Sequence, residues 1–324
     1  MEVAPRDQRE WDVDRWHSPI ALIITALAVG VTLAGWSLSP TAALMVAVGA
    51  VTLGMPHGAL DVSIGPRLMK WYWFFPAYGL AAALTVAGWM AAPKYGLAIF
   101  VLLSWAHFGF GDVDGWHFVR WIAVARGAAT GGLVLGLPLA LHADVVAPIF
   151  NTLMLNHDTF AAGTSVVWGT AMLAVAVPAG AVAGAAHLLT RQWAGVAELA
   201  LLAALGVYAT PLLTFAVYFA LWHSPRHLLA SGVDRRSMTP TVVATFATLV
   251  LGVSAWMLME PAKATAIRVV FIGLAALTVP HLAVTAVARR RHLALATRVP
   301  GRDVSPDAIL SASGVARPQL TRAA

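Results

Sequence analysis

The stretch TAIRVVFIGLAALTVPHLAVTAVA, residues 265–288, carries only two ionisable side chains, Arg268 and His281. A helix of about 20 predominantly apolar residues spans the hydrocarbon core of a bilayer. Similar stretches recur along the chain of 324 residues, of which 59% are hydrophobic and 11% charged. A soluble domain has about 25% charged residues. The apolar runs are continuous rather than alternating, so the sequence predicts an all-α, polytopic transmembrane bundle and not a β-barrel.

We predict about ten transmembrane helices within residues 18–288. Their approximate bounds are 18–36, 41–62, 72–91, 95–111, 119–140, 163–189, 195–209, 211–229, 241–259 and 265–288. Only Thr210 and Pro211 separate the seventh from the eighth, so one broken helix and a total of nine spans is the alternative. Residues 142–160 are expected to form an interfacial helix or loop.

The two ends of the chain differ from the apolar middle. Residues 1–17 form a charged N-terminal segment, and residues 289–324 a basic tail that is expected to be disordered and to lie against anionic headgroups. The net charge of +6 sits mostly at these ends. It therefore bears on membrane orientation, and no nucleic-acid partner is expected.

Lysines and arginines in short loops indicate which side of the membrane is cytoplasmic. With ten spans and the N-terminus inside, the cytoplasmic side holds Arg67, Lys70, Arg191, Arg226, Arg235, Arg236, Arg289, Arg290 and Arg291. The opposite side holds only Lys94 and Lys263. This asymmetry predicts that both termini are cytoplasmic. We expect the protein to lie in the inner (plasma) membrane.

Five of the eleven histidines lie at ends of predicted spans: His57 in GMPHGALD, His107 in SWAHFGFGD, His223 and His227 in LWHSPRH, and His281 in TVPHLAV. In this topology all five lie near the cytoplasmic face. Ionisable side chains at membrane depth are costly and usually functional. Imidazole is also the commonest protein ligand for transition metals. The joint pattern predicts a metal site inside the membrane protein.

His223 and His227 are four residues apart, so a regular helix presents both on one face. Pro225 lies between them and cannot donate a hydrogen bond to the Leu221 carbonyl, so we expect the helix to kink there. The chain has no cysteine, which excludes disulfides, thiolate-bound zinc and iron–sulfur clusters.

Two carboxylates follow motif histidines closely: Asp61 follows His57, and Asp112 follows His107. A metal-bound imidazole usually donates its other N–H to a carboxylate or carbonyl, and both aspartates are candidates for that role. The alternative is an ordinary carboxylate at a helix end. The remaining histidines are expected to be structural or solvated: His17, His117, His142, His157, His187 and His292.

Aromatic residues cluster in sequence around the histidine motifs: Trp105, Phe108, Phe110, Tyr218, Phe219 and Trp222. They are explained either by an interfacial aromatic belt or by the wall of an apolar substrate tunnel. The glycines of HFGFGD are not a phosphate loop, because no GK[ST] follows. We expect them to allow close approach of a neighbouring helix.

The motifs PHGALD, WAHFGFGD, WHSPRH and the late PH resemble the Brp/Blh family of membrane β-carotene 15,15′-dioxygenases, over residues 40–288. The resemblance implies a multi-span protein that binds Fe(II) and cleaves β-carotene with O₂ into two molecules of all-trans-retinal. It implies His57, His107, His223 and His227 as iron ligands. His281 matches a family histidine and is either a fifth ligand or a support for the site. A rhodopsin is a candidate acceptor of the product.

Two other classes of protein stay open from the residues alone. One is a histidine-box lipid hydroxylase or desaturase, although only His223 and His227 are clustered in sequence. The other is a non-enzymatic carrier that binds haem or a metal ion. Imidazole suits Fe, Cu, Zn and Ni alike, so the ligand type does not select the metal.

Overall fold

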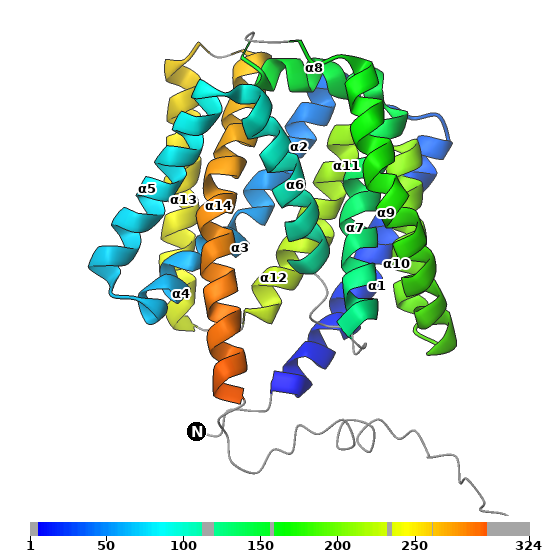
Figure 1. Ribbon diagram of the computed structural model, residues 1–324, viewed down its shortest axis with the longest axis horizontal. Helices are drawn as coiled ribbons and strands as arrows, with labels where there is room; N and C mark the ends of the chain where they lie inside the picture. Colours follow the sequence, from blue (N-terminus) through cyan, green and yellow to red (C-terminus); the bar gives the residue numbers. More distant parts are fainter. Residues whose placement is uncertain (1–5, 112–119, 156–158, 232–234, 261, 297–324) are drawn as a thin grey trace, which may run out of the picture.

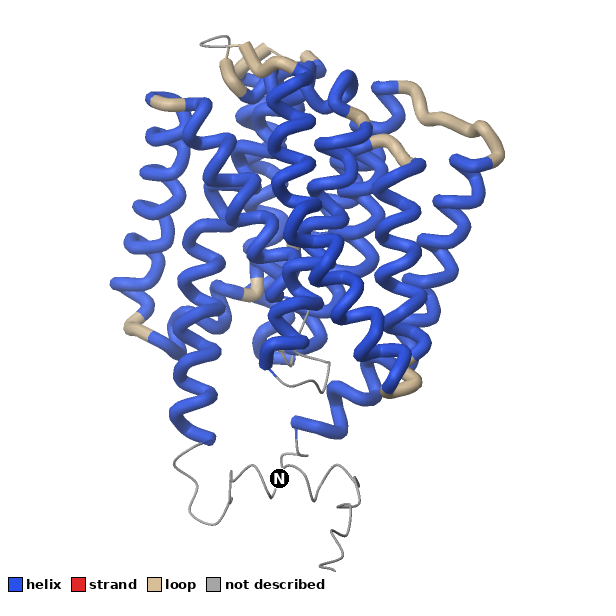
Figure 2. Tube along the Cα trace, turned by 45° about the vertical axis from the view of Figure 1, so that its right-hand side comes forward, coloured by secondary structure: helices blue, strands red, loops and turns tan. Residues whose placement is uncertain are grey.

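The computed structural model describes residues 6–111, 120–155, 159–231, 235–260 and 262–296. In this part of the chain every regular element is helical, and the helices stand side by side in one bundle (Figures 1 and 2). The elements are α1 (Arg6–Leu33), α2 (Pro40–Gly54), α3 (Pro56–Ala59), α4 (Asp61–Leu68), α5 (Trp71–Ala91), α6 (Pro93–Gly111), α7 (Arg120–Leu141), α8 (Ala143–Leu153), α9 (Ala162–Leu189), α10 (Trp193–Tyr208), α11 (Pro211–Val217), the π-helix η1 (Tyr218–His223), α12 (Ser224–Ala230), α13 (Arg235–Leu258) and α14 (Lys263–Ala296).

Six helical stretches in the described residues are long and apolar enough to cross a membrane: Pro40–Leu68, Trp71–Ala91, Trp121–Leu141, Ala162–Leu189, Arg236–Leu258 and Lys263–Arg290. Three shorter apolar helices, His17–Leu33, Ala143–Leu153 and Trp193–Tyr208, accompany them. The prediction of an all-α membrane-type fold is therefore confirmed. The expected total of about ten spans, with nine as the alternative, is not decided by these helix lengths.

The connection around Thr210 contains two helices rather than one broken helix. Helix α10 ends at Tyr208, α11 begins at Pro211, and the Thr214 hydroxyl donates to the Leu205 carbonyl at 3.2 Å across the break. Residues 142–160 contain α8, which lies across one end of the bundle (Figure 1). Helix α14 continues to Ala296, beyond the predicted end at residue 288, and residues 297–324 lie outside the described part.

The span predicted over 41–62 is interrupted where it carries His57. Helix α2 ends at Gly54, the short α3 follows, and α4 runs on to Leu68. Pro56 has no backbone N–H, so the α-helical hydrogen-bond ladder is incomplete at this point. The interruption turns the His57 ring toward the centre of the bundle, where it meets rings from other helices.

Immediately before Pro225, where a kink is predicted, the structure has a six-residue π-helix, Tyr218–His223. The carbonyl of Leu221, which Pro225 cannot serve, accepts a hydrogen bond from Nε2 of His17 at 2.5 Å. Short π-helical segments are often found at functional sites. Here the π-helix ends at His223. The Leu221 carbonyl, which has lost its helical donor, accepts a hydrogen bond from His17 of α1 instead.

Glycines bring α6, α7 and α9 unusually close together. A Cβ atom on Gly109 would fall against the backbone carbonyl of Gly127, and one on Gly131 against the carbonyl of Trp105. A Cβ on Gly111 would meet the His227 ring. The expectation that the glycines of HFGFGD allow close helix approach is confirmed.

We predict that Gly109→Ala destabilises the protein, because the added methyl group meets backbone that cannot move aside. Overpacking of this kind costs about 1–3 kcal/mol. Thermal unfolding of the detergent-solubilised protein measures the effect. Gly184→Ala is the matched control, since nothing lies within 4 Å of a Cβ there. Equal melting temperatures for the two variants would show that the α6–α7 contact tolerates a side chain.

Candidate metal centre

The structure gathers all five motif histidines into one cluster from four separate stretches of chain. They come from α3 (His57), α6 (His107), η1 and α12 (His223 and His227), and α14 (His281). Ring centroids lie 4.5 Å apart for His107 and His223 and 4.6 Å for His223 and His227. The widest measured pair, His57 and His107, is 6.3 Å apart. The prediction that distant histidine motifs meet at one place is borne out by this geometry.

Three of the rings already have the spacing of a metal-binding group. His57, His107 and His223 each offer one ring nitrogen, and these nitrogens lie within 4.8 Å of one another. Nε2 of His107 is 3.0 Å from Nε2 of His223. Nδ1 of His57 donates to the Gly54 carbonyl at 2.5 Å, which leaves its Nε2 as the nitrogen with an available lone pair. Three neutral imidazoles around one point are the donor set of many metal sites.

His281 is held in the manner of a metal-bound imidazole. Its Nδ1 donates to Oδ2 of Asp61 at 2.9 Å, and the Tyr78 hydroxyl donates to the same oxygen at 3.1 Å. Its Nε2 is buried and has no hydrogen-bond partner among the described residues. A carboxylate on one nitrogen with the other directed at the metal is the usual arrangement for a ligand histidine.

The carboxylate partner differs from the one that sequence proximity suggested. Asp61 supports His281, 220 positions away, whereas its neighbour His57 is held by a backbone carbonyl. The reason is the break at Leu60, after which Asp61 opens a new helix. Asp112, expected to support His107, lies outside the described residues.

An apolar cavity of about 230 Å³ adjoins the cluster. His57, His107 and His281 lie in its wall together with Asp61 and Tyr78. Most other lining side chains are aliphatic or aromatic and come from α4, α5, α6, α7, α8, α11, η1, α13 and α14. An apolar cavity with a few polar groups at one place is the common form of a binding site for an apolar small molecule.

Of the six predicted tunnel residues, Phe108 and Phe219 line this cavity. Trp105, Tyr218, Trp222 and Phe110 do not. The Trp105 indole donates to the Ala128 carbonyl at 3.0 Å, the Tyr218 hydroxyl to the Phe108 carbonyl at 2.7 Å, and the Trp222 indole to the Thr25 hydroxyl at 2.9 Å. Phe110 is 40% exposed on the outside of the bundle. Three of these aromatics are thus fixed by buried hydrogen bonds between helices.

A buried charged network, which the sequence reasoning missed, supports the helix that carries His227. Glu198 of α10 forms a bidentate pair with Arg226, with both N–O distances 2.7 Å, and its Oε2 lies 2.8 Å from Nη2 of Arg126. Arg126 also donates to Nε2 of His187 at 2.7 Å. Arg226 was assigned to a cytoplasmic loop, but only 10% of its side chain is exposed.

The network holds the histidine pair because Arg226 lies between His223 and His227 in the chain. Its guanidinium also stacks on Trp222, 4.7 Å from the ring centroid. One feature of the sequence does indicate a buried ion pair at this position. Glu198 is the sole acidic residue of the apolar segment Trp193–Tyr208, and a carboxylate at membrane depth needs a partner.

His17, His142 and His187 have structural roles, as expected. His187 accepts from Arg126, and its ring Nδ1 lies 3.0 Å from the side-chain oxygen of Gln192. His142 of the α7–α8 corner bonds the Val207 carbonyl at 3.0 Å. His117 and His157 lie outside the described residues.

Comparisons with known proteins agree on one family. Residues 48–288 match the family model described as beta-carotene 15,15′-dioxygenase. A beta-carotene 15,15′-dioxygenase from uncultured marine bacterium 66A03 is 29% identical over 255 residues, which cover 72% of this chain and 88% of the relative. A probable beta-carotene 15,15′-dioxygenase Blh from Halobacterium salinarum is 29% identical over 314 residues, covering 82% and 89%. No solved structure matches the chain.

We predict that Glu198→Ala strongly destabilises the protein, because it removes the carboxylate that lies between two arginines. Removing one partner of a buried ion pair costs about 3–5 kcal/mol. Thermal unfolding in detergent is the measurement. Asp144→Asn, at an exposed carboxylate of α8, is the control and should melt as the wild type does. A wild-type melting temperature for Glu198→Ala would mean that the network contributes nothing to stability.

Proposed function

Because the chain belongs to the beta-carotene 15,15′-dioxygenase family, whose model matches residues 48–288, we propose that it cleaves β-carotene with O₂ at the central 15,15′ double bond into two molecules of all-trans-retinal. The observation that carries this proposal is the convergence of five imidazoles beside an apolar cavity. A hydrocarbon substrate offers no group for a hydrogen bond or an ion pair. Its site must therefore be apolar, with reactive groups concentrated at one place.

We propose that His57, His107, His223 and His227 bind one Fe(II) ion and that His281 is a further ligand. The close ring nitrogens of the first three support this set, and so does the buried, unpartnered Nε2 of His281. When bound, a redox-active ion would supply the activation of O₂ that oxidative cleavage of a double bond requires. Asp61 and Tyr78 fix the orientation of the His281 ring.

The rest of the protein's contribution is placement and exclusion of water. The cavity wall confines a long apolar molecule, so that one double bond is held beside the histidines. Side chains such as Phe108 and Phe219 keep water away from that point. No other acid or base of the chain is assigned a catalytic role.

We further propose ten spans in the plasma membrane with both termini in the cytoplasm. The uneven distribution of lysine and arginine between the loops supports this orientation. The start of α1 and the end of α14 also lie at the same end of the bundle, opposite α8 (Figure 1). With this arrangement the histidine cluster lies toward the cytoplasmic half of the membrane.

Expression in a bacterial host that accumulates β-carotene tests the reaction. We expect the orange colour to fade and retinal to appear as the single cleavage product, identified by chromatography against a standard. His107→Ala should leave the colour, whereas His292→Ala, in the C-terminal part of the chain, should behave as the wild type. Persistent colour with well-expressed wild-type protein would refute the proposed reaction.

Metal analysis of purified variants tests the ligand set. We expect about one iron per wild-type chain and a large loss of iron when any of the five clustered histidines is replaced by Ala. Asp61→Asn should weaken iron binding by roughly 10–100-fold, as loss of a carboxylate behind a ligand does. Full iron content in His281→Ala would remove His281 from the set. Two metal ions per chain, or the absorption of a haem, would favour the alternative classes of protein.

Reporter fusions test the orientation. A compartment-sensitive reporter fused after Lys94 and one fused at the C-terminus should give opposite signals, because residue 94 is expected outside and the tail inside. Lys70, in the loop between α4 and α5, provides a third fusion that should agree with the C-terminus. Matching signals from residue 94 and the C-terminus would contradict the proposed topology.

A further inference from the structure

Helix α8 lies across the end of the bundle opposite the start of α1 and the end of α14 (Figure 1). Its side chains form one end of the apolar cavity. Val146, Ile149, Phe150 and Leu153 of α8 line that end. The histidines lie farther along the bundle. On α14 the lining residues extend from Phe271 to His281, a separation of ten positions that corresponds to about 15 Å of helix. The cavity therefore includes an elongated part between the histidines and the α8 residues Val146, Ile149, Phe150 and Leu153, which we call the shaft.

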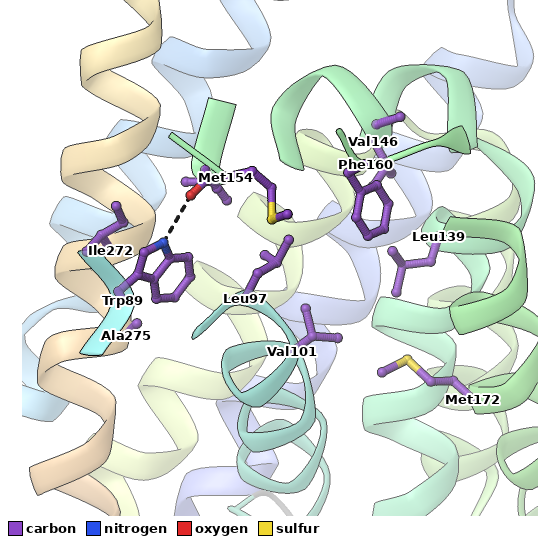
Figure 3. Packing of buried hydrophobic residues seen from close by; sticks show 12 residues of the cluster. Trp89, Leu97, Val101, Leu139, Val146, Met154, Phe160, Met172, Ile272 and Ala275 are labelled. Carbon is purple, nitrogen blue, oxygen red and sulfur yellow. Dashed lines mark hydrogen bonds between the residues drawn. The ribbon is translucent and has the colours of Figure 1, made fainter. Parts of the chain in front are cut away.

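Hydrogen bonds from two long helices hold α8 in place. The Trp89 indole of α5 donates to the Leu153 carbonyl at 3.0 Å (Figure 3), and Nε of Arg268 on α14 donates to the Thr152 carbonyl at 2.9 Å. Val146 and Leu153 are 4% and 1% exposed and belong to a tightly packed apolar cluster. A helix anchored in this way is a fixed wall rather than a movable flap.

The other part of the cavity reaches the outside of the bundle. Phe75 of α5 lines the cavity and is 47% exposed. Ala244 and Thr248 of α13 also line it. Of the apolar part of α13, only 6% is buried inside the bundle. The cavity thus has an open side at α5 and α13, which face lipid, and a closed end at α8.

We propose that α8 is the stop that sets which double bond of the polyene lies beside the histidines, with Phe150 as a specificity-determining residue. This inference rests on the proposed function. A hydrocarbon cannot be positioned along a channel by hydrogen bonds, so its register depends on where its end meets a wall. One half of the molecule occupies the shaft, and the other half extends toward α5 and α13. Central cleavage follows from the fixed depth of the shaft.

The products report the register directly. Oxidative cleavage breaks one carbon–carbon double bond and places one oxygen atom of O₂ on each of its two carbons, giving two carbonyl compounds, both of which are aldehydes when the central bond is cleaved. If the substrate lies deeper in the shaft, a different double bond is cleaved. One carbonyl product is then longer than retinal, and the other is shorter by the same number of carbons. A cleaved carbon that carries a methyl group becomes a ketone, and one that carries a hydrogen becomes an aldehyde.

Phe150→Ala is the first test, because it removes a ring from the closed end. The Phe150 ring packs against Phe160, with centroids 5.0 Å apart, so its loss opens space under α8. We expect two carbonyl products of unequal length to appear and the preference for central cleavage to fall roughly tenfold, as for a pocket that gains or loses a small apolar group. Val145→Ala is the matched control on the same helix, since Val145 is 40% exposed and does not line the cavity.

Val146→Phe is the converse test, because it fills space at the closed end instead of opening it. Continued cleavage of a shorter substrate shows that the variant is folded. A larger side chain at the closed end shortens the shaft, so turnover of β-carotene should fall roughly tenfold. A truncated carotenoid that lacks one terminal ring and the polyene carbons next to it should still be cleaved, because its shorter end fits. Equal loss with both substrates would overturn the inference.

Products are separated by chromatography and identified by mass. If the wild type makes retinal and Phe150→Ala makes only retinal at the rate of the Val145→Ala control, α8 is not the stop and the inference alone fails. If the wild type makes no cleavage product, the proposed function fails and the inference falls with it.

Discussion

A polar group buried in this bundle is costly unless it has a partner within the protein, because lipid offers none. The histidine cluster satisfies this constraint at each of its supports. The Gly54 carbonyl beside the α2–α3 break accepts from His57, and the Leu221 carbonyl in the π-helix accepts from His17. Asp61 receives the N–H of His281. The helices are irregular where the histidines lie, and the histidines themselves supply part of the hydrogen bonding that irregular backbone needs.

The same constraint explains the charged network beside the cluster. A single carboxylate, Glu198, lies between Arg126 and Arg226 with almost no exposure to solvent. Buried ion pairs contribute little net stability, but they fix geometry because a broken pair leaves an uncompensated charge. Arg226 lies between His223 and His227, so the network fixes the one stretch of chain that supplies two histidines. On the other side of the cluster, Asp61 and Tyr78 do the same for His281.

The cavity joins a polar cluster to a long apolar space, and each part depends on a different property of the helices. Small residues let α6, α7 and α9 pack closely, which brings His107 to the centre of the bundle. Large apolar side chains from α8, α11 and α14 leave space between them. These side chains offer water no hydrogen-bond partners, so water does not occupy that space stably. The arrangement suits a substrate that is entirely hydrocarbon and a reaction confined to one of its bonds.

The sequence by itself determined the class of fold, the approximate position of the helices and the role of the HFGFGD glycines. It also determined which five of the eleven histidines form the cluster. These features are local: hydropathy over some twenty residues, a proline or a glycine, a short motif. Only the tertiary structure decided that Asp61 serves His281 rather than His57, that Arg226 is buried, and that Trp105, Tyr218 and Trp222 hold helices together instead of lining the cavity. The physical reason is that a helix that is apolar on every side gives no sign of which face points inward. Rotation about its axis, and so the direction of each side chain, is set by packing against helices that are distant in the sequence.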